Sequence, residues 1–163
     1  GNYYDNPNAL KGLAFANMVG SMIWLSRDYF ETNFGNQRQH ITTDVLAPEF
    51  RIEFLLDKIK NKSDSTIDPN CLLYMMKAMT TFDLNADPNW PHSLSQLTGN
   101  MMFVSYKNDW RYPADETDNL VNIFKRADLN CEHHKLDSII GHGAFIHDYA
   151  SLSSILRNFI NAG

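Results

Sequence analysis

The chain has 163 residues, enough for one ordinary domain with a sizeable hydrophobic core. Its apolar fraction of 44% and net charge of −5 exclude a disordered chain and a basic surface for nucleic acid or anionic membrane. No apolar run approaches the roughly 20 residues of a membrane helix, and no signal peptide is visible. We therefore expect a cytoplasmic protein that binds neither nucleic acid nor a membrane.

The first part of the chain, residues 1–90, has the pattern of a helical region without strands. Apolar residues recur at helical spacing over 10–34 and again over about 48–60. Asp68 and Pro69 then provide an N-cap and a proline at the first helical position, and they predict a third helix behind them. The polar stretches at 36–44 and 61–66 are expected to be loops.

In the second part, residues 91–163, the spacing of the apolar residues changes, and the new pattern predicts a βαβα unit. A nearly continuous apolar run at 101–106 is typical of a buried parallel strand, and a helix is expected over 114–127. A weaker strand candidate at 129–136 and a final helix from about Asp148 complete the unit. The two strands should be parallel neighbours. Because two strands cannot form an independent parallel sheet, we expect the rest of the sheet in sequence upstream of this chain.

Two ionisable residues follow the two predicted strands. Asp109 comes after the first strand and His142 after the second, so both should lie at the carboxyl edge of the sheet, where reactive groups gather in α/β folds. A carboxylate there can hold an imidazole in one tautomer and leave its other nitrogen as a general base. Alternatively, Asp109 caps the following turn and His142 is an ordinary loop histidine.

The other histidines and the two cysteines have plainer interpretations. His133 and His134 are adjacent on a strand and should point to opposite faces, so they cannot easily chelate one metal. No spacing matches a zinc site, and no metal is expected. Cys71 and Cys131 are predicted to be buried thiols, with a reactive thiol as the minor alternative.

Several segments, in the same order along the chain, resemble the homoserine O-acetyltransferase family. Residues 108–113 (NDWRYP) resemble the family's strand end with Asp, a bulky residue, an aromatic residue and Pro. Residues 141–146 (GHGAFI) resemble its Gly-His-Asp-Ala-Phe-Leu motif. Four further segments resemble its helical lid: 12–16 (GLAFA), 23–26 (IWLS), 68–74 (DPNCLLY) and 82–84 (FDL). Together the segments span nearly the whole chain.

The resemblance implies the C-terminal portion of an α/β-hydrolase fold, with residues 1–90 as a helical lid and 91–163 as a βαβα segment of the same incomplete domain. It implies an acyltransferase in methionine biosynthesis that moves an acetyl group from acetyl-CoA to homoserine through a Ser-Asp-His triad, with no bound cofactor. Asp109 and His142 would be the catalytic Asp and His. The chain contains no Gly-x-Ser-x-Gly elbow. The serine is therefore expected in a missing N-terminal core, and a homodimer through the lid is expected.

Three positions bear on the substrate. Asn17 stands where the family has an Arg implied to bind the substrate carboxylate, and Gly143 stands where it has an Asp implied to contact the amino group. Arg111 replaces a usually apolar residue and is either a replacement cation or a surface residue. These departures keep two alternatives open: an esterase that uses water as the acceptor, and a non-catalytic helical module that dimerises.

Overall fold

The computed structural model describes residues 10–62 and 68–162, which fall into two units. One unit comprises Gly1–Met22 and Phe30–Asp83, and the other comprises Ile23–Tyr29 and Leu84–Gly163. The short segment Ile23–Tyr29 thus lies with the unit formed mainly by the C-terminal half. Part of the predicted loop at 61–66 falls outside the described residues.

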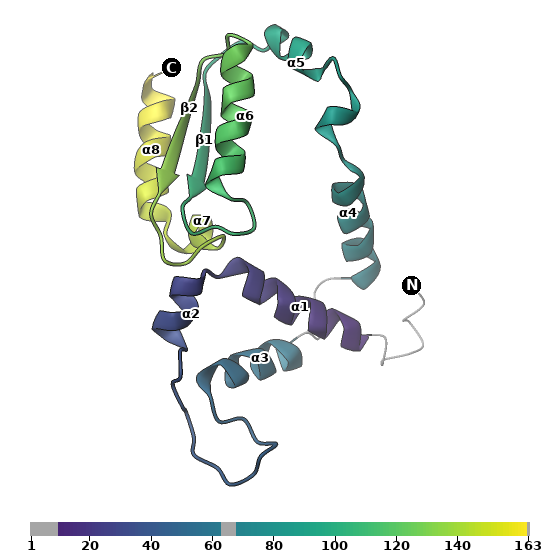
Figure 1. Cartoon of the computed structure of the whole chain (residues 1–163), viewed down its shortest axis with the longest axis vertical. Coiled ribbons are helices and arrows are strands. Elements are labelled where there is room, and N and C mark those ends of the chain that lie inside the picture. The colour runs from purple at the N-terminus through teal and green to yellow at the C-terminus, as the bar shows by residue number, and fades with distance from the viewer. Residues whose placement is uncertain (1–9, 63–67, 163) are drawn as a thin grey trace. The chain divides into compact units, whose positions relative to one another are not determined.

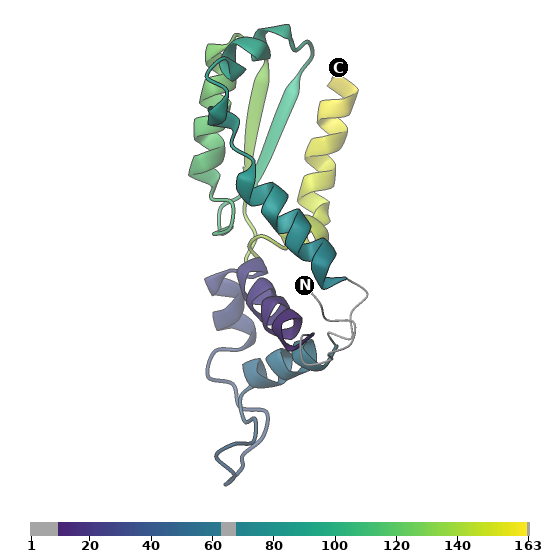
Figure 2. The same cartoon turned by 90° about the vertical axis from the view of Figure 1, so that its right-hand side faces the viewer.

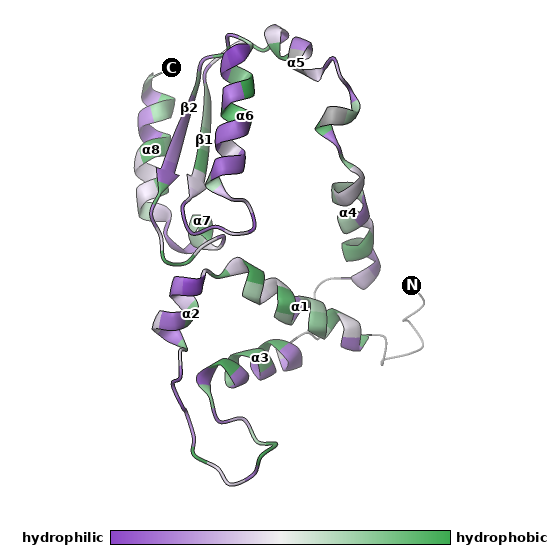
Figure 3. Cartoon of the chain, in the orientation of Figure 1, coloured by the Kyte–Doolittle hydropathy of each residue, from purple (hydrophilic) through white to green (hydrophobic). Residues whose placement is uncertain are grey.

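A two-stranded parallel sheet forms the centre of the second unit (Figure 1). Strand β1 (Met101–Tyr106) pairs with β2 (Cys131–Leu136) in a register that places Met101 beside Cys131 and Tyr106 beside Leu136. The predicted strand at 101–106 is confirmed, as is its parallel pairing with the second strand. The apolar β1 and the polar β2 stand out in Figure 3.

Helices cover both faces of this sheet. Figures 1 and 2 place α6 (Ala114–Arg126) on one face and α8 (Tyr149–Ala162) on the other. Acidic residues in the first turn of α6 and basic residues in its last turn complement the helix dipole. Phe124 of α6 packs edge-on against Phe103 of β1, with ring centroids 5.3 Å apart. Val121 of α6 is buried beside them.

Shorter elements complete the second unit. Helix α5 (Trp90–Ser93) and the 3₁₀ turns η2 (Leu84–Ala86) and η3 (Leu94–Gln96) precede β1, and the one-turn helix α7 (Ala144–His147) precedes α8.

The predicted single helix over 10–34 is wrong, because the chain forms two helices there. Helix α1 (Lys11–Trp24) ends before Ser26, and α2 (Arg27–Asn33) begins after it. Apolar spacing continues through the break, so periodicity could not detect it. The break is stabilised by distant residues: the Ser26 amide donates to the carbonyl of Ile140 at 2.8 Å.

The first unit contains two further helices, α3 (Arg51–Lys62) and α4 (Pro69–Thr81). Helix α3 starts at residue 51 rather than near 48, because the Glu53 carboxylate accepts the amides of Glu49 and Phe50 and caps the helix. Those two backbone hydrogen bonds lower the pKa of Glu53. The predicted cap of α4 is confirmed, since the Asp68 carboxylate accepts the Asn70 amide at 2.7 Å.

Helix α4 exposes much of its apolar surface. Large apolar side chains on it, or directly after it, are more than half exposed: Leu73, Tyr74, Met75, Met76, Met79 and Phe82. Cys71, in its first turn, is also exposed, so the prediction of two buried thiols holds for Cys131 and is wrong for Cys71. Within 10–62 and 68–162, no helix combines the length and apolarity needed to cross a bilayer.

Candidate active site

Asp109 and His142 meet at the carboxyl edge of the sheet. Asp109 ends a tight turn after β1, in which its amide donates to the carbonyl of Tyr106 at 3.1 Å. His142 lies in the loop after β2. Its Nδ1 is 2.8 Å from Asp109 Oδ2, which is a hydrogen-bond distance. The side chains are 7% exposed for Asp109 and 14% for His142, so the contact is largely shielded from water.

The Asp109 carboxylate fulfils both roles that the sequence had left open. Its Oδ1 accepts the amides of Arg111 at 2.9 Å and Tyr112 at 3.0 Å, and these bonds cap the turn. Its Oδ2 is thereby directed at His142. Because an ionised carboxylate only accepts, the proton of neutral His142 resides on Nδ1. Nε2 then carries a lone pair, and no residue in the described ranges bonds to it. This is the arrangement of a general base.

Aromatic rings surround the His142 imidazole. The ring centroids of Trp24, Tyr112 and Phe145 lie 5.1, 5.2 and 5.7 Å from that of His142, with Trp24 and Phe145 edge-on. Ring contacts of this kind restrict the orientation of the imidazole. Tyr106, at the end of β1, has a buried hydroxyl. This burial raises the pKa of Tyr106, and the negative charge of Asp148 raises it further by a smaller amount.

The two glycines beside His142 differ in whether a side chain could replace the glycine hydrogen. Gly141 has a φ of +87°, and a Cβ there would lie 2.7 Å from the Ser26 amide nitrogen. Both the left-handed conformation and the close approach therefore require glycine. Gly143 has an ordinary φ of −68°, and a Cβ there would meet nothing closer than 3.4 Å. Position 143 therefore tolerates a Cβ, as the aspartate of the family motif requires.

The substrate positions predicted from the sequence fall in different places. Gly143 adjoins His142, and its amide donates to the carbonyl of Trp24. Arg111 is exposed and places its guanidinium over the Tyr112 ring, 5.5 Å from the centroid, so it lies one ring away from the imidazole. Asn17 lies on α1 in the first unit, where its carbonyl accepts the Ser21 hydroxyl. Their roles in binding substrate stay predictions.

A second histidine–carboxylate cluster was not predicted. His133 and His134 point to opposite faces of the sheet, as expected, but His133 lies between Ser105 and Asp118. Ser105 Oγ is 2.7 Å from His133 Nε2, and His133 Nδ1 is 2.9 Å from Asp118 Oδ1. Asp118 also bonds to Lys135. Alternation on β1 and β2 could have indicated that Ser105 and His133 share a face.

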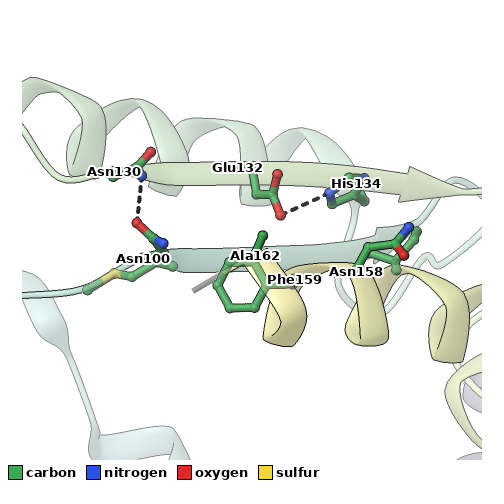
Figure 4. Close-up of a pocket in the computed structure, with 9 residues that line it drawn as sticks. Asn100, Asn130, Glu132, His134, Asn158, Phe159 and Ala162 are labelled. Atoms are coloured by element: carbon green, nitrogen blue, oxygen red, sulfur yellow. Dashed lines mark hydrogen bonds and ion pairs between the residues drawn. The ribbon is translucent and has the colours of Figure 1, made fainter.

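A groove of about 360 Å³ lies between the strands and α8 (Figure 4). Asn100 and Asn130, which line the groove and precede the two strands, bond to each other, and Glu132 bonds to His134. Ile155 and Phe159 of α8 line its other side. The groove starts at the amino ends of the strands, whereas Asp109 and His142 follow the carboxyl ends. No group of three or more potential metal ligands gathers among the described residues.

The fold and the site together define the chain as a C-terminal portion of an α/β-hydrolase fold. The crystal structure of homoserine O-acetyltransferase from Bacillus anthracis superimposes with a TM-score of 0.82 at 23% identity, over 99% of this chain and 43% of that one. The crystal structure of esterase E22 gives 0.74 at 17% identity, over 92% of this chain and 42% of that one. The predicted fold class is confirmed.

The sequence relatives are homoserine O-acetyltransferases, which confirms the resemblance noted from the motifs. The chain is 29% identical to that of Methanococcus vannielii over 163 residues, covering 99% of this chain and 33% of the relative. It is 28% identical to that of Haloferax volcanii over 176 residues, covering 100% and 42%. The chain thus spans about a third to two fifths of the length of these relatives. No protein-family model matches it.

Proposed function

We propose that this chain supplies the Asp and the His of a Ser-Asp-His triad in an acyltransferase resembling homoserine O-acetyltransferase. The observation that carries the proposal is the 2.8 Å contact between His142 Nδ1 and Asp109 Oδ2, with Nε2 left unbonded among the described residues. The names of the sequence relatives support the reaction class. The serine would come from sequence outside these 163 residues, since no Gly-x-Ser-x-Gly occurs within them.

In the proposed reaction, His142 moves one proton in each half. Nε2 takes the proton of the serine hydroxyl as its oxygen attacks the acetyl carbonyl of acetyl-CoA, and then gives that proton to the departing thiolate. Nε2 next takes the proton of the acceptor hydroxyl, whose oxygen attacks the acetyl-serine. The same proton returns to the serine oxygen as the ester product leaves. Asp109 stabilises the imidazolium in both halves.

An esterase that uses water as the acceptor is the second candidate. Gly143 favours it, because the aspartate implied to bind the homoserine amino group is missing beside His142. The test is an assay of the full-length protein with acetyl-CoA, with and without homoserine, that measures free thiol, O-acetylhomoserine and acetate. O-acetylhomoserine formed in step with thiol supports the transferase. Thiol and acetate released at a rate independent of homoserine support the esterase.

We further propose that the full-length protein forms a homodimer through the exposed apolar side chains of α4. Met75, Met76 and Met79 are each more than half exposed, and surfaces of this kind mark protein interfaces. Light scattering should give the mass of a dimer, and Met76→Lys with Met79→Lys should give a monomer. A monomeric wild-type protein at micromolar concentration contradicts the proposal. A dimer without either enzymatic activity supports a non-catalytic dimerisation module.

A further inference from the structure

Residues 24–26, which comprise the last residue of α1 and the two residues before α2, bond to the His142 loop on both sides of the histidine. Before it, the Ser26 amide donates to the Ile140 carbonyl at 2.8 Å, and the Ser26 hydroxyl donates to the Ile139 carbonyl. After it, the Gly143 amide donates to the Trp24 carbonyl at 2.9 Å. Ser26 is 2% exposed, so water does not compete for these bonds.

The same three residues also bond to the Asp109 loop. The indole nitrogen of Trp110 donates to the Leu25 carbonyl at 3.0 Å. The Asn108 side-chain amide adds a link from the same loop to Asp28 at 3.2 Å. Both loops that carry the proposed catalytic pair are therefore fixed to one short segment, and that segment comes from a distant part of the sequence.

The ends of the two helices provide the bonding groups. The last carbonyls of a helix have no partner within it, so the carbonyls of Trp24 and Leu25 are available to the two loops. Ser26 caps the next helix, since its Oγ accepts the Tyr29 amide at 3.0 Å while its hydroxyl proton goes to Ile139. Gly141 allows the close approach, because a Cβ there would collide with the Ser26 amide.

We propose that residues 24–26 are a positioning element for the Asp109–His142 pair, with Ser26 as its principal positioning residue. Neither Ser26 nor Trp110 is assigned contact with the reacting atoms. Each acts by fixing a loop, so that the Nδ1–Oδ2 distance and the direction of Nε2 are set together. The expected effect of residues 24–26 on turnover rests on the function proposed above. Their expected effect on the geometry of the Asp109–His142 pair does not.

The test compares Ser26→Ala and Trp110→Phe with Ser95→Ala in the full-length protein. Ser95 is a matched control, because among the described residues its hydroxyl bonds to the His92 carbonyl of its own turn and to neither catalytic loop. The first readout is the NMR resonance of the His142 Nδ1 proton, which is shifted far downfield by a bond to carboxylate and is identified by its loss in His142→Ala. We expect Ser95→Ala to keep this resonance, Ser26→Ala to lose or broaden it, and Trp110→Phe to shift it.

The second readout is turnover. Ser26→Ala should lower kcat roughly 10- to 100-fold with little change in KM, because misplacement of a catalytic group by about 1 Å costs on that order. In a His142→Ala background, Ser26→Ala should cost less than about 3-fold, since residues that act as one unit are not additive. A merely structural role would reduce turnover in both backgrounds alike.

Three outcomes would overturn the inference: an unchanged resonance in Ser26→Ala, a fall in kcat without a change in the resonance, or full additivity with His142→Ala. If Ser26→Ala does not fold, Trp110→Phe decides by the same criteria. If the wild-type protein shows neither acetyl transfer nor ester hydrolysis, the proposed function fails. The resonance then still decides whether residues 24–26 position the pair.

Discussion

Two histidine–aspartate pairs lie in the same unit, and they differ in the use of the second imidazole nitrogen. In the Asp109–His142 pair, both residues follow strand ends, and Nε2 has no bonding partner among the described residues. In the Asp118–His133 pair, the imidazole lies between β1 and α6, and its Nε2 is already 2.7 Å from the Ser105 hydroxyl.

The second cluster has the residue types of a Ser-His-Asp triad without its accessibility. Ser105 is inside a strand and 6% exposed, and the His133 side chain is also 6% exposed, so no substrate atom can approach either. Its hydrogen bonds join β1, β2 and α6 and satisfy buried polar groups. Residue types and distances alone therefore do not identify a catalytic site. Of the two imidazoles, only that of His142 follows the strand ends and has an Nε2 without a bonding partner among the described residues.

The largest effect should come from His142→Ala in the full-length protein. Removing the general base should lower kcat roughly 10⁴- to 10⁶-fold. The matched variant His133→Ala should keep kcat within a few-fold of the wild-type value. Its free energy of unfolding should fall by about 1–3 kcal/mol, because Ser105 and Asp118 lose their hydrogen-bond partner. Steady-state assays and denaturant titration measure the two effects. Near-normal turnover in His142→Ala would contradict the triad.

Asp109→Asn should have the next largest effect, a loss of roughly 10³- to 10⁴-fold in kcat. The asparagine oxygen can still accept the amides of Arg111 and Tyr112, so the turn is kept. Its amide group, however, would face Nδ1 and favour the wrong tautomer of His142. Asp118→Asn is the control and should leave kcat unchanged. Equal losses of kcat in Asp109→Asn and Asp118→Asn would contradict the prediction that only the Asp109–His142 pair takes part in catalysis.

Gly141→Ala should lower kcat roughly 10- to 100-fold by displacing the His142 loop. Its φ of +87° disfavours alanine, and the added Cβ would lie 2.7 Å from the Ser26 amide nitrogen. Gly20→Ala is the matched control, because a Cβ at Gly20 meets nothing within 4 Å. Thermal unfolding checks that both variants fold. Wild-type kcat in Gly141→Ala would mean that the loop tolerates displacement.

Combining Asn17→Arg with Gly143→Asp should raise kcat/KM for homoserine by roughly 10-fold if these positions record a lost recognition of the amino acid. A Cβ at position 143 would make only ordinary contacts, since its nearest atom would be 3.4 Å away. Hydrolysis of a simple acetyl ester is the reference activity and should not rise. An equal change in both activities would show that these two residues do not determine which acceptor is used.

The smallest effect concerns stability at low pH. Hydrogen bonds from Lys135 and then from His133 lower the pKa of Asp118 in the folded state. Because the pKa of Asp118 is lower in the folded state, its carboxylate stabilises the fold at any pH above the ordinary pKa of 3.8. The stabilisation is lost as the pH falls through the lower pKa of the folded state. The stability difference between wild type and Asp118→Asn should therefore be present at pH 7 and shrink below about pH 4. A constant difference across that range would contradict the ion pair.

Sequence by itself determined the elements that depend on local patterns. The apolar run of β1, the charge order of α6 and the Asp68 cap each depend on residues within one or two turns, so their positions were predicted closely. The pairing of Asp109 with His142 was also accessible, because the carboxyl ends of neighbouring parallel strands meet at one edge. The family motifs supported the same two residues.

Only the tertiary structure decided the features that depend on distant contacts. The break between α1 and α2 depends on bonds from Ser26 to residues 139 and 140, and helical periodicity ran through it unchanged. The Ser105–His133–Asp118 cluster joins three elements and has no local signature. Exposure of Cys71 likewise depends on what packs against α4 and not on its apolar neighbours in sequence. A hydrogen bond between residues far apart in the chain leaves no period in the sequence, and for that reason the support of the His142 loop became visible only in the folded chain.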